Sequence, residues 1–502
     1  MYHSKTFICV LLAATALCCG CSQRDDMVGE ESQATVESQE ALVTFRLQTN
    51  ATTVAGTRSA EDSYQHVQGT ADEYKVTTAR VYFFDAPTKL FAKTVVLKEL
   101  KRQGSDANGN IVYETERVAV PQGTYDIFVT ANTDRVLTTT TEEAFLADID
   151  STTYVRAQID DISNGVVMTN RASANLATVL RNSREVNDEN VVSVTLERVL
   201  ARIDIAKSRE TFELTDDNGR QYASVTLDGH YIVNLPKYYY SFRHTAVLTT
   251  LEVPQWDVNE HFGNINDVNG YVIDPDFFKK PIDASQFANE DKYYEHFATD
   301  SNSPGAISWT AFKPVAETPQ YNTAYCLENC ALQPAQKNGY STGVIFRARM
   351  EPYNNVYQLS ANGELTLVTD KQAYPEVLYY WNYNFYDSAA ALSKAVGGTV
   401  TGQNLDMYRA QKFEKSDDGY RCYYKYWIRH LDNYKNTTMG VMEFGVVRNN
   451  LYRLLIANVS GLGSGDGETT IDPDTPDEGE TYLKVVLNVK PWIVRDLTDI
   501  VL

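Results

Sequence analysis

The sequence is short of basic residues and of long apolar runs. Lysine and arginine total 45 against 66 aspartate and glutamate residues, which gives a net charge of −21. This balance argues against a nucleic-acid partner, because a phosphate backbone is bound by a surplus of Lys and Arg. Nowhere does the chain approach the roughly 18 consecutive apolar residues of a transmembrane helix.

The motifs of common enzymes and metal proteins are also missing from the sequence. The seven histidines are scattered, and none lies in an H-E-x-x-H or similar metal-binding spacing. The sequence contains no G-x-S-x-G elbow, no phosphate-binding P-loop and no G-x-G-x-x-G motif. We therefore predict a protein that is not an enzyme and that carries no metal and no cofactor.

Cysteine is rare outside the N-terminal leader. Of the seven cysteines, only Cys326, Cys330 and Cys422 lie in the body of the chain. This odd count allows at most one disulfide within the chain. Two pairings stay open: Cys326 with Cys330, or either of them with Cys422. The spacing lacks the His or Cys partners of a zinc site, so structural cysteines are favoured over a redox or metal role.

The N-terminus has the features of an export signal. Lys5 precedes an apolar run, Phe7–Leu17, that is too short to span a bilayer and ends in small residues. The segment Leu17–Ser22 resembles a bacterial lipobox, in which Cys21 is the acylated residue. We therefore predict a lipoprotein signal peptide over residues 1–21, with a plain signal peptide cut nearby as the alternative.

The rest of the chain is rich in patterns typical of strands. Tyrosine is heavily used, with 33 residues, and apolar side chains alternate with polar ones in many short runs separated by turns. Short helices are expected at 142–149, at 172–181 and, most clearly, at 387–396. A chain of 502 residues exceeds one hydrophobic core. The prediction is a mainly β protein with antiparallel β-sandwich domains and few helices.

Two segments differ in composition from the strands around them. A first strand over 41–49, in which Val43, Phe45 and Leu47 alternate with polar residues, is followed by a soft polar loop that contains one arginine, Arg58. A second segment, the acidic loop 460–480, is made largely of Gly, Ser, Asp, Pro and Thr. This composition predicts a disordered or linker-like insert before the last strands.

Several stretches together resemble the fimbrillins, the type V pilins of the Bacteroidales. The Gly123–Asn132 stretch is similar to the family's strand with the pattern G-x-Y-x-hydrophobic-x-hydrophobic-x-A-N, and Leu196–Ile205 is similar to its R-hydrophobic-x-A-(K/R) strand. Cys330 departs from the family pattern. The segments that most resemble the major subunit of Mfa-type short fimbriae are Tyr325–Asn329, Cys422–His430, Phe444–Tyr452 and Val489–Trp492.

The resemblance implies two transthyretin-like β-sandwich domains and a structural role in a cell-surface fimbria. Such pilins reach the outer membrane as lipoproteins, and an arginine-specific protease removes their first strand. A strand of the next subunit then fills the vacated position by β-augmentation. The implied function is a polymerising shaft subunit that supports adhesion and biofilm formation. Its implied partners are further copies of itself in a head-to-tail fibre, and the anchor and tip subunits.

Carried over to this sequence, the resemblance divides the chain into parts. Residues 22–58 form a propeptide that ends at the cleavage site between Arg58 and Ser59. An N-terminal sandwich follows over 59–205, and a C-terminal sandwich over 206–502. The strand that begins at Leu483 belongs to this second domain. The donor tail, 493–502, supplies its apolar residues to a neighbour: Ile493, Val494, Leu497, Ile500, Val501 and Leu502.

Two alternatives of other kinds stay open. A surface lipoprotein that binds glycans and does not polymerise would keep Cys21 and its lipid in the mature protein. An uncleaved anchor subunit of the same fimbria would also keep them. A shaft subunit would instead begin near Ser59.

Overall fold

The computed structural model describes most of the chain from Glu40 onward. The described residues are 40–49, 65–67, 69–105, 111–151, 161–182, 190–246, 266–267, 270–277, 280, 294–295, 309–331, 335–416, 419–430, 439–440, 443–465, 472–477, 483–491 and 494–496. Cys21, Arg58 and Ser59 lie outside them.

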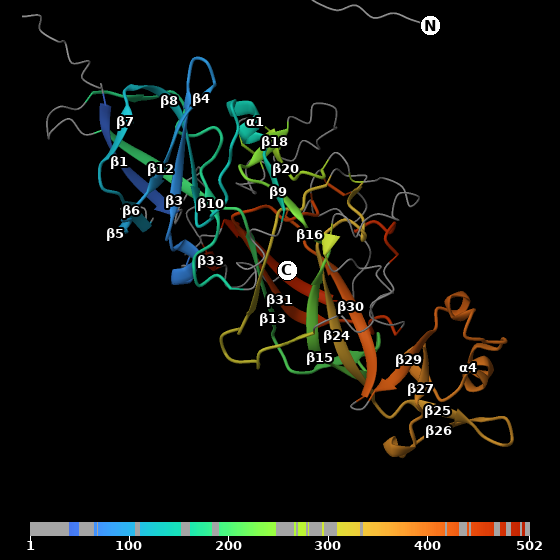
Figure 1. Ribbon diagram of the computed structural model, residues 1–502. Helices are drawn as coiled ribbons and strands as arrows, with labels where there is room; N and C mark the ends of the chain where they lie inside the picture. The colour runs from blue at the N-terminus through green and yellow to red at the C-terminus, as the bar shows by residue number, and fades with distance from the viewer. Residues whose placement is uncertain are drawn as a thin grey trace, which may run out of the picture. The chain divides into compact units, whose positions relative to one another are not determined.

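The N-terminal part forms one ten-stranded sheet, drawn in blue to green in Figure 1. Its main path runs β4-β3-β8-β10-β12-β1-β6-β5, with β7 paired to β1 and β11 paired to β8. The strands are β1 (Glu40–Thr49), β3 (Ala79–Asp85), β4 (Phe91–Leu97), β5 (Lys101–Ser105), β6 (Ile111–Glu114), β7 (Val118–Pro121), β8 (Gly123–Ala131), β10 (Met168–Thr169), β11 (Thr178–Leu180) and β12 (Asn190–Arg198).

The second domain packs two sheets around its own core. The smaller sheet has the order β23-β13-β31-β32, and β13 lies parallel to β31, far from it in sequence (Figure 1). Its strands are β13 (Ala201–Lys207), β23 (Asn322–Cys326), β31 (Asn450–Val459) and β32 (Leu483–Pro491). The chain therefore passes from the first sheet to this one between Arg198 and Ala201.

The larger sheet of this domain is ten-stranded and runs β14-β15-β24-β30-β29-β27-β28-β25-β26, with β22 on β15. One apolar core joins the two sheets, with Ile203 on one side and Phe346 on the other, both without exposed surface. The strands are β14 (Phe212–Thr215), β15 (Gln221–Val233), β22 (Thr310–Ala311), β24 (Gly343–Pro352), β25 (Val356–Leu359), β26 (Leu365–Leu367), β27 (Val377–Trp381), β28 (Asn384–Tyr386), β29 (Gln411–Ser416) and β30 (Gly419–Trp427).

Short strand pairs and helices connect these sheets. The pairs are β9 (Ile149–Ser151) with β17 (Tyr238–Tyr240), β16 (Leu235–Pro236) with β21 (Tyr294–Glu295), β2 (Gln65–Val67) with β33 (Val494–Asp496), and β20 (Gly270–Ile273) with β18 (His244–Ala246) and β19 (Asn266–Asp267). The helices are α1 (Glu142–Leu146), α4 (Ala389–Val396), and the 3-10 turns η1 (Ala71–Tyr74), η5 (Lys371–Ala373) and η6 (Leu405–Tyr408).

The mainly β class predicted from the sequence is confirmed, with two β-sandwich domains and few helices. The helices expected at 142–149 and 387–396 are present as α1 and α4. Ser388 caps the start of α4, and Gly397 ends it at a φ of 71°, a conformation that glycine adopts without strain. The helix expected at 172–181 is wrong: turns lead there into β11, which pairs with β8.

The prediction that the acidic loop 460–480 is a free linker is wrong for its described parts. Leu462 is buried in the second core. Asp474 forms an ion pair with Lys337 at 3.0 Å, and the buried Asp477 accepts a hydrogen bond from Ser341. These contacts hold residues 460–465 and 472–477 against the second domain. Composition alone could not predict them, because the partners Lys337 and Ser341 lie far away in the chain. Among the described residues, no helix has the length and apolar character needed to cross a membrane.

Candidate functional site

The first strand, β1, is an inner strand of the first sheet. On one side it runs parallel to β12, from Val43 opposite Asn190 to Thr49 opposite Leu196. On the other side it runs antiparallel to β7 and then to β6. The strand predicted from the alternation at 41–49 is therefore present, and it is hydrogen-bonded along both edges.

Alternate side chains of β1 form part of the first core. Ala41, Val43, Phe45 and Leu47 have no exposed surface. The ring of Phe45 meets Phe83 edge to face, with centroids 6.2 Å apart. Phe83 in turn meets Tyr125 at 5.6 Å. Of the β1 residues in between, Leu42 and Arg46 are exposed and Thr44 is buried, so the alternation of the sequence corresponds to one apolar face in the core and a second face that is only partly exposed.

The pairing of β1 with its antiparallel neighbours is interrupted at one point. Val43 lies opposite Val118 and Arg46 lies opposite Glu114, so two residues of β1 face three residues of the partner chain, a β-bulge. At the bulge the N–H of Phe45 donates to the buried hydroxyl of Thr115 at 3.0 Å. The N–H of Thr115 donates to the carbonyl oxygen of Phe45 at 3.1 Å.

Beyond β1 the chain leads to the pair β2–β33. This pair places residues 65–67, which follow Arg58 in the chain, beside residues 494–496, with Val67 opposite Val494. Of the six predicted donor residues, only Val494 lies in a described strand. Ile493, Leu497, Ile500, Val501 and Leu502 are outside the described residues. The strand predicted from Leu483 is present as β32, paired with β31 in the second domain.

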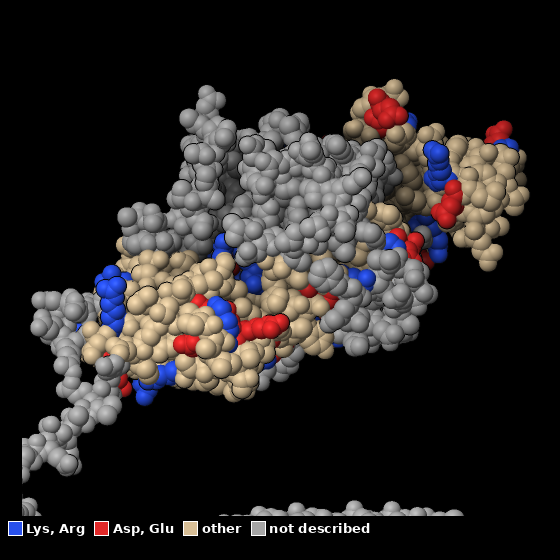
Figure 2. Space-filling view, turned by 90° about the horizontal axis from the view of Figure 1, so that it is seen from above, with Lys and Arg blue, Asp and Glu red and all other residues tan. Residues whose placement is uncertain are grey.

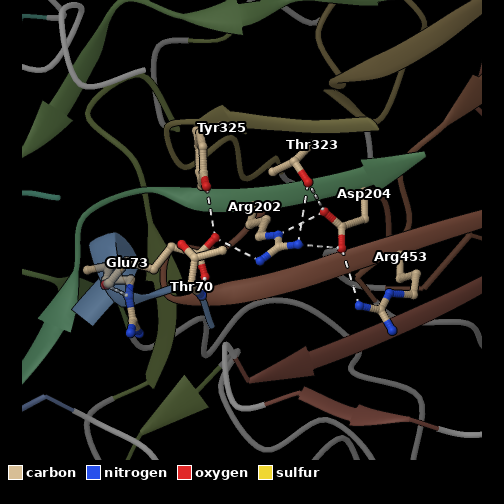
Figure 3. A network of polar contacts seen from close by, with 8 residues as sticks. Thr70, Glu73, Arg202, Asp204, Thr323, Tyr325 and Arg453 are labelled. Carbon is tan, nitrogen blue, oxygen red and sulfur yellow. Dashed lines mark hydrogen bonds and ion pairs between the residues drawn. The ribbon is translucent and has the colours of Figure 1, made fainter. Parts of the chain in front are cut away.

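A buried polar network holds η1, which follows β2, against the second domain (Figure 3). Glu73 has no exposed surface, and its carboxylate accepts hydrogen bonds from Arg202 Nη1 at 2.7 Å and from the Tyr325 hydroxyl at 2.8 Å. The backbone carbonyl of Glu73 accepts a bond of 2.6 Å from Arg198 Nε. Burial and then the nearby Glu73 carboxylate raise the pKa of Tyr325, so this phenol stays protonated as a donor.

The network continues through Asp204, which is also fully buried. Its two oxygens accept bonds from Arg202 at 2.8 and 2.9 Å, and Arg453 reaches it at 3.3 Å from β31. Because Arg202 and Asp204 belong to β13 while Glu73 precedes β3, the network connects the two sandwiches. These hydrogen bonds to η1 come from β12, β13 and β23, while Tyr74 of η1 also packs against the first core, to which β1 contributes.

Sequence reasoning missed this network, although one signal for it was present. Thr70 and Glu73 have the spacing of a capping box, and the structure contains that box, with the Thr70 N–H donating to Glu73 at 2.9 Å. The partners of Glu73 are far away in the chain, so no local pattern could indicate them.

A second polar cluster lies in the first domain, between α1 and β8. Lys89 donates to the buried Asp126 and lies 3.4 Å from Glu142 Oε2, while the N–H of Ala177 donates to Asp126 at 2.7 Å. Burial, and then the proximity of Asp126, raises the pKa of Glu142 to about 7. Glu142 is therefore a carboxyl group that holds its proton close to neutral pH.

The three body cysteines are free thiols in the structure, and all are buried. Neither pairing expected from the sequence is formed: Cys326 lies on β23 of one sheet and Cys422 on β30 of the other, each within the apolar core. Burial raises the pKa of Cys326 and of Cys422 to about 12. Cys330 donates weakly to the carbonyl of Val446 instead of meeting a second sulfur. Within the described ranges, no group of His, Cys, Asp and Glu side chains could hold a metal ion.

Two family models match the chain. Residues 41–198, which run from β1 to the end of β12, match the major fimbrial subunit protein FimA. Residues 417–498, which include β30, β31 and β32, match the C-terminal region of fimbrillin, described as a major fimbrial subunit protein type IV. Both matched regions are therefore similar to fimbrial subunit proteins.

The solved structures that match the chain share little sequence with it. A fimbrilin (FimA) from Porphyromonas gingivalis is 14% identical, with 91% of this chain and 100% of that chain covered and a TM-score of 0.42. The tip fimbrial protein Mfa3 from the same organism, with a C-terminal truncation, is 12% identical, with 90% and 100% covered and a TM-score of 0.37. The fimbrial anchor protein Mfa2, also from that organism, is 11% identical, with 61% and 77% covered and a TM-score of 0.23. No curated protein matches the chain in sequence.

Proposed function

We propose that the chain is the polymerising shaft subunit of a fimbria that supports adhesion and biofilm formation. It is exported as a lipoprotein held to the outer membrane through Cys21. An arginine-specific protease cuts between Arg58 and Ser59, β1 leaves the first sheet, and a strand from another copy takes its place. The fibre grows head to tail and joins anchor and tip subunits at its ends.

The observation that carries the proposal is the position of β1. It is the first described strand, it lies inside the sheet, and the predicted cleavage site falls between it and β2. Val43, Phe45 and Leu47 are fully buried, and each such side chain stabilises the fold by roughly 1.5–3 kcal/mol. Loss of the strand therefore removes roughly 5–9 kcal/mol of apolar burial as well as its hydrogen bonds. A strand from another copy restores both.

The buried network at Glu73 supports the same proposal from the other side of the cut. Arg202, Tyr325 and Arg198 hold η1 through hydrogen bonds to Glu73, none of which comes from β1, and Tyr74 of η1 also packs against the first core. A cut between Arg58 and Ser59 therefore separates β1, which can leave, from β2 and η1, which remain attached to the rest of the chain. This arrangement lets the second domain and η1 persist while the first sheet exchanges its strand.

Surface charge gives no competing explanation for assembly. On the face shown in Figure 2, acidic and basic side chains lie interspersed over the described surface. A chain with a net charge of −21 repels its own copies. Assembly by backbone pairing and apolar burial, which does not depend on opposite net charges, fits this composition.

Replacement of Arg58 tests the cleavage step. Cells that make Arg58→Ala should accumulate a lipidated precursor that retains β1 and forms no fibres, seen by N-terminal sequencing of surface-sheared protein and by electron microscopy. Arg46→Ala is the matched control: Arg46 lies within β1, where the backbone is paired, so this variant should mature and polymerise. Normal fibres from Arg58→Ala would contradict the proposal, and a mature wild-type protein that keeps Cys21 would favour the glycan-binding or anchor alternatives.

Deletion of the tail tests the donor step. A chain without Ile493–Leu502 should be exported and cut at Arg58, because neither large core contains these residues among its described members. It should remain a monomer, because it has no strand to donate. Long fibres from the truncated chain would show that another segment, such as β32, supplies the donor.

A further inference from the structure

We propose that Ile500 of one copy occupies the position of Phe45 in the next copy and thereby sets the register of the donated strand. The inference rests on the strand exchange proposed above. It adds the residue at the centre of the contact between two copies, and it names Phe83 and Thr115 as the residues that recognise it.

The position of Phe45 has the strictest requirements of the strand. It is fully buried, and its ring contacts Phe83, whose far side meets Tyr125. Two residues away on either side, Val43 and Leu47 are also fully buried. An occupant must therefore be a large apolar residue, and its neighbours at two residues before and after it must fill apolar sites too, because alternate residues of a strand share a face.

The backbone at this position is recognised as well. The bulge leaves the hydroxyl of Thr115 as acceptor for the N–H of Phe45, and the N–H of Thr115 as donor to the carbonyl of Phe45. Thr115 is 7% exposed, so both groups lose partners inside the protein when β1 leaves. An unpaired buried polar group costs about 1–3 kcal/mol. The occupant must therefore supply both a free N–H and a carbonyl, which Ile does and Pro does not.

Among the apolar tail residues with a neighbour two positions away on both sides, Ile500 alone has no charged residue at either position. Ile493 is followed at two residues by Arg495, and Val494 by Asp496. Leu497 has Arg495 and Asp499 on its face, and Val501 also has Asp499. Ile500 has Thr498 and Leu502 on its face. Thr498 has the branched shape of valine with a hydroxyl in place of one methyl group. The side-chain argument is the same for either direction of the tail, but only a tail that runs in the direction of β1 also turns the N–H and carbonyl of Ile500 toward Thr115.

Site-directed cross-linking in the full chain tests the register. Fibres of the double variant Ile500→Cys with Phe83→Cys, treated with a mild oxidant, should give a ladder of covalent multimers on a non-reducing gel. The double variant Asp499→Cys with Phe83→Cys is the matched control and should give no ladder, because residue 499 points to the opposite face. The native thiols do not interfere, since all three are buried. If loss of the Phe83 ring prevents folding, Val192→Cys, which lies opposite residue 45 on β12, takes its place in both variants.

Elongation kinetics give a second reading. Ile500→Ala should slow elongation about tenfold or more, since burial of one large side chain is lost. Thr115→Val should slow it too, whereas Thr115→Ser keeps the acceptor and should elongate at close to the wild-type rate. A ladder from Asp499→Cys, or from cysteine at Ile493 or Leu497 and not at Ile500, would overturn the register while leaving strand exchange intact. Absence of fibres from the wild-type chain would instead refute the proposed function.

Discussion

Replacement of Phe45 by alanine should lower the stability of the uncut precursor and leave the stability of the assembled fibre unchanged. Phe45 has no exposed surface and packs edge to face on Phe83. A Phe→Ala change at such a site costs about 3–5 kcal/mol, because the side chain leaves a cavity. In the uncut precursor, Phe45→Ala should lower the free energy of unfolding by that amount. In the assembled fibre it should change nothing, because a subunit cut at Arg58 no longer contains residue 45.

The assay is urea denaturation followed by tryptophan fluorescence, on purified precursor and on purified fibres of each variant. Phe83→Ala is the matched control, because Phe83 has the other ring of the same pair but stays in the chain after cleavage. It should lower stability in precursor and fibre alike. A fibre of Phe45→Ala that is destabilised as much as its precursor would refute the reasoning, since β1 would then still be present in the mature subunit.

Three further predictions concern buried polar groups. Glu73→Gln should lower the free energy of unfolding by about 3 kcal/mol, because it leaves the buried Arg202 with one carboxylate fewer. Glu116→Gln, in the exposed pair with Lys101, should have a much smaller effect; equal effects in urea melts would contradict this. Because the pKa of Glu142 is raised from 4.5 to about 7 in the folded state, the stability it contributes is complete below pH 4.5 and is lost as the pH rises through 7. Unfolding free energies measured from pH 4 to 8 should therefore fall less for Glu142→Gln than for the wild type, and identical slopes would count against the shift. Cys326, Cys330 and Cys422 should not react with a thiol reagent at pH 8 until urea unfolds the chain, since all three are buried; fast labelling of the native protein would be inconsistent with that burial.

The class of fold, and the strand at the centre of the proposed site, could be predicted from the sequence alone. The alternation of Val43, Phe45 and Leu47 with polar residues predicts one buried face, and the structure has that face in the first core. Alternation is a local property, with a period of two residues, so it can be recognised without a partner strand. The same holds for β32 and for α4, whose cap residues stand beside an alanine-rich run.

Predictions from local sequence pattern were wrong where the structure of a segment depends on a partner far away in the chain. The alanines within 172–181 suggest a helix, but pairing of Thr178–Leu180 with β8 makes a strand. The acidic loop has the composition of a linker, yet Lys337 and Ser341 hold it in place.

Tertiary structure alone also decided which buried charges meet. Glu73, Arg202 and Tyr325 are far apart in the chain and come together only because η1, β13 and β23 converge (Figure 3). The hydrogen bonds at the Thr115 bulge also depend on the pairing of distant segments. Nothing in the Thr115 segment marks its hydroxyl as the acceptor for Phe45, because the need for it arises only when two strands with unequal numbers of residues are aligned. Periodicity therefore determined what is buried, and the pairing of remote segments determined what each buried polar group contacts.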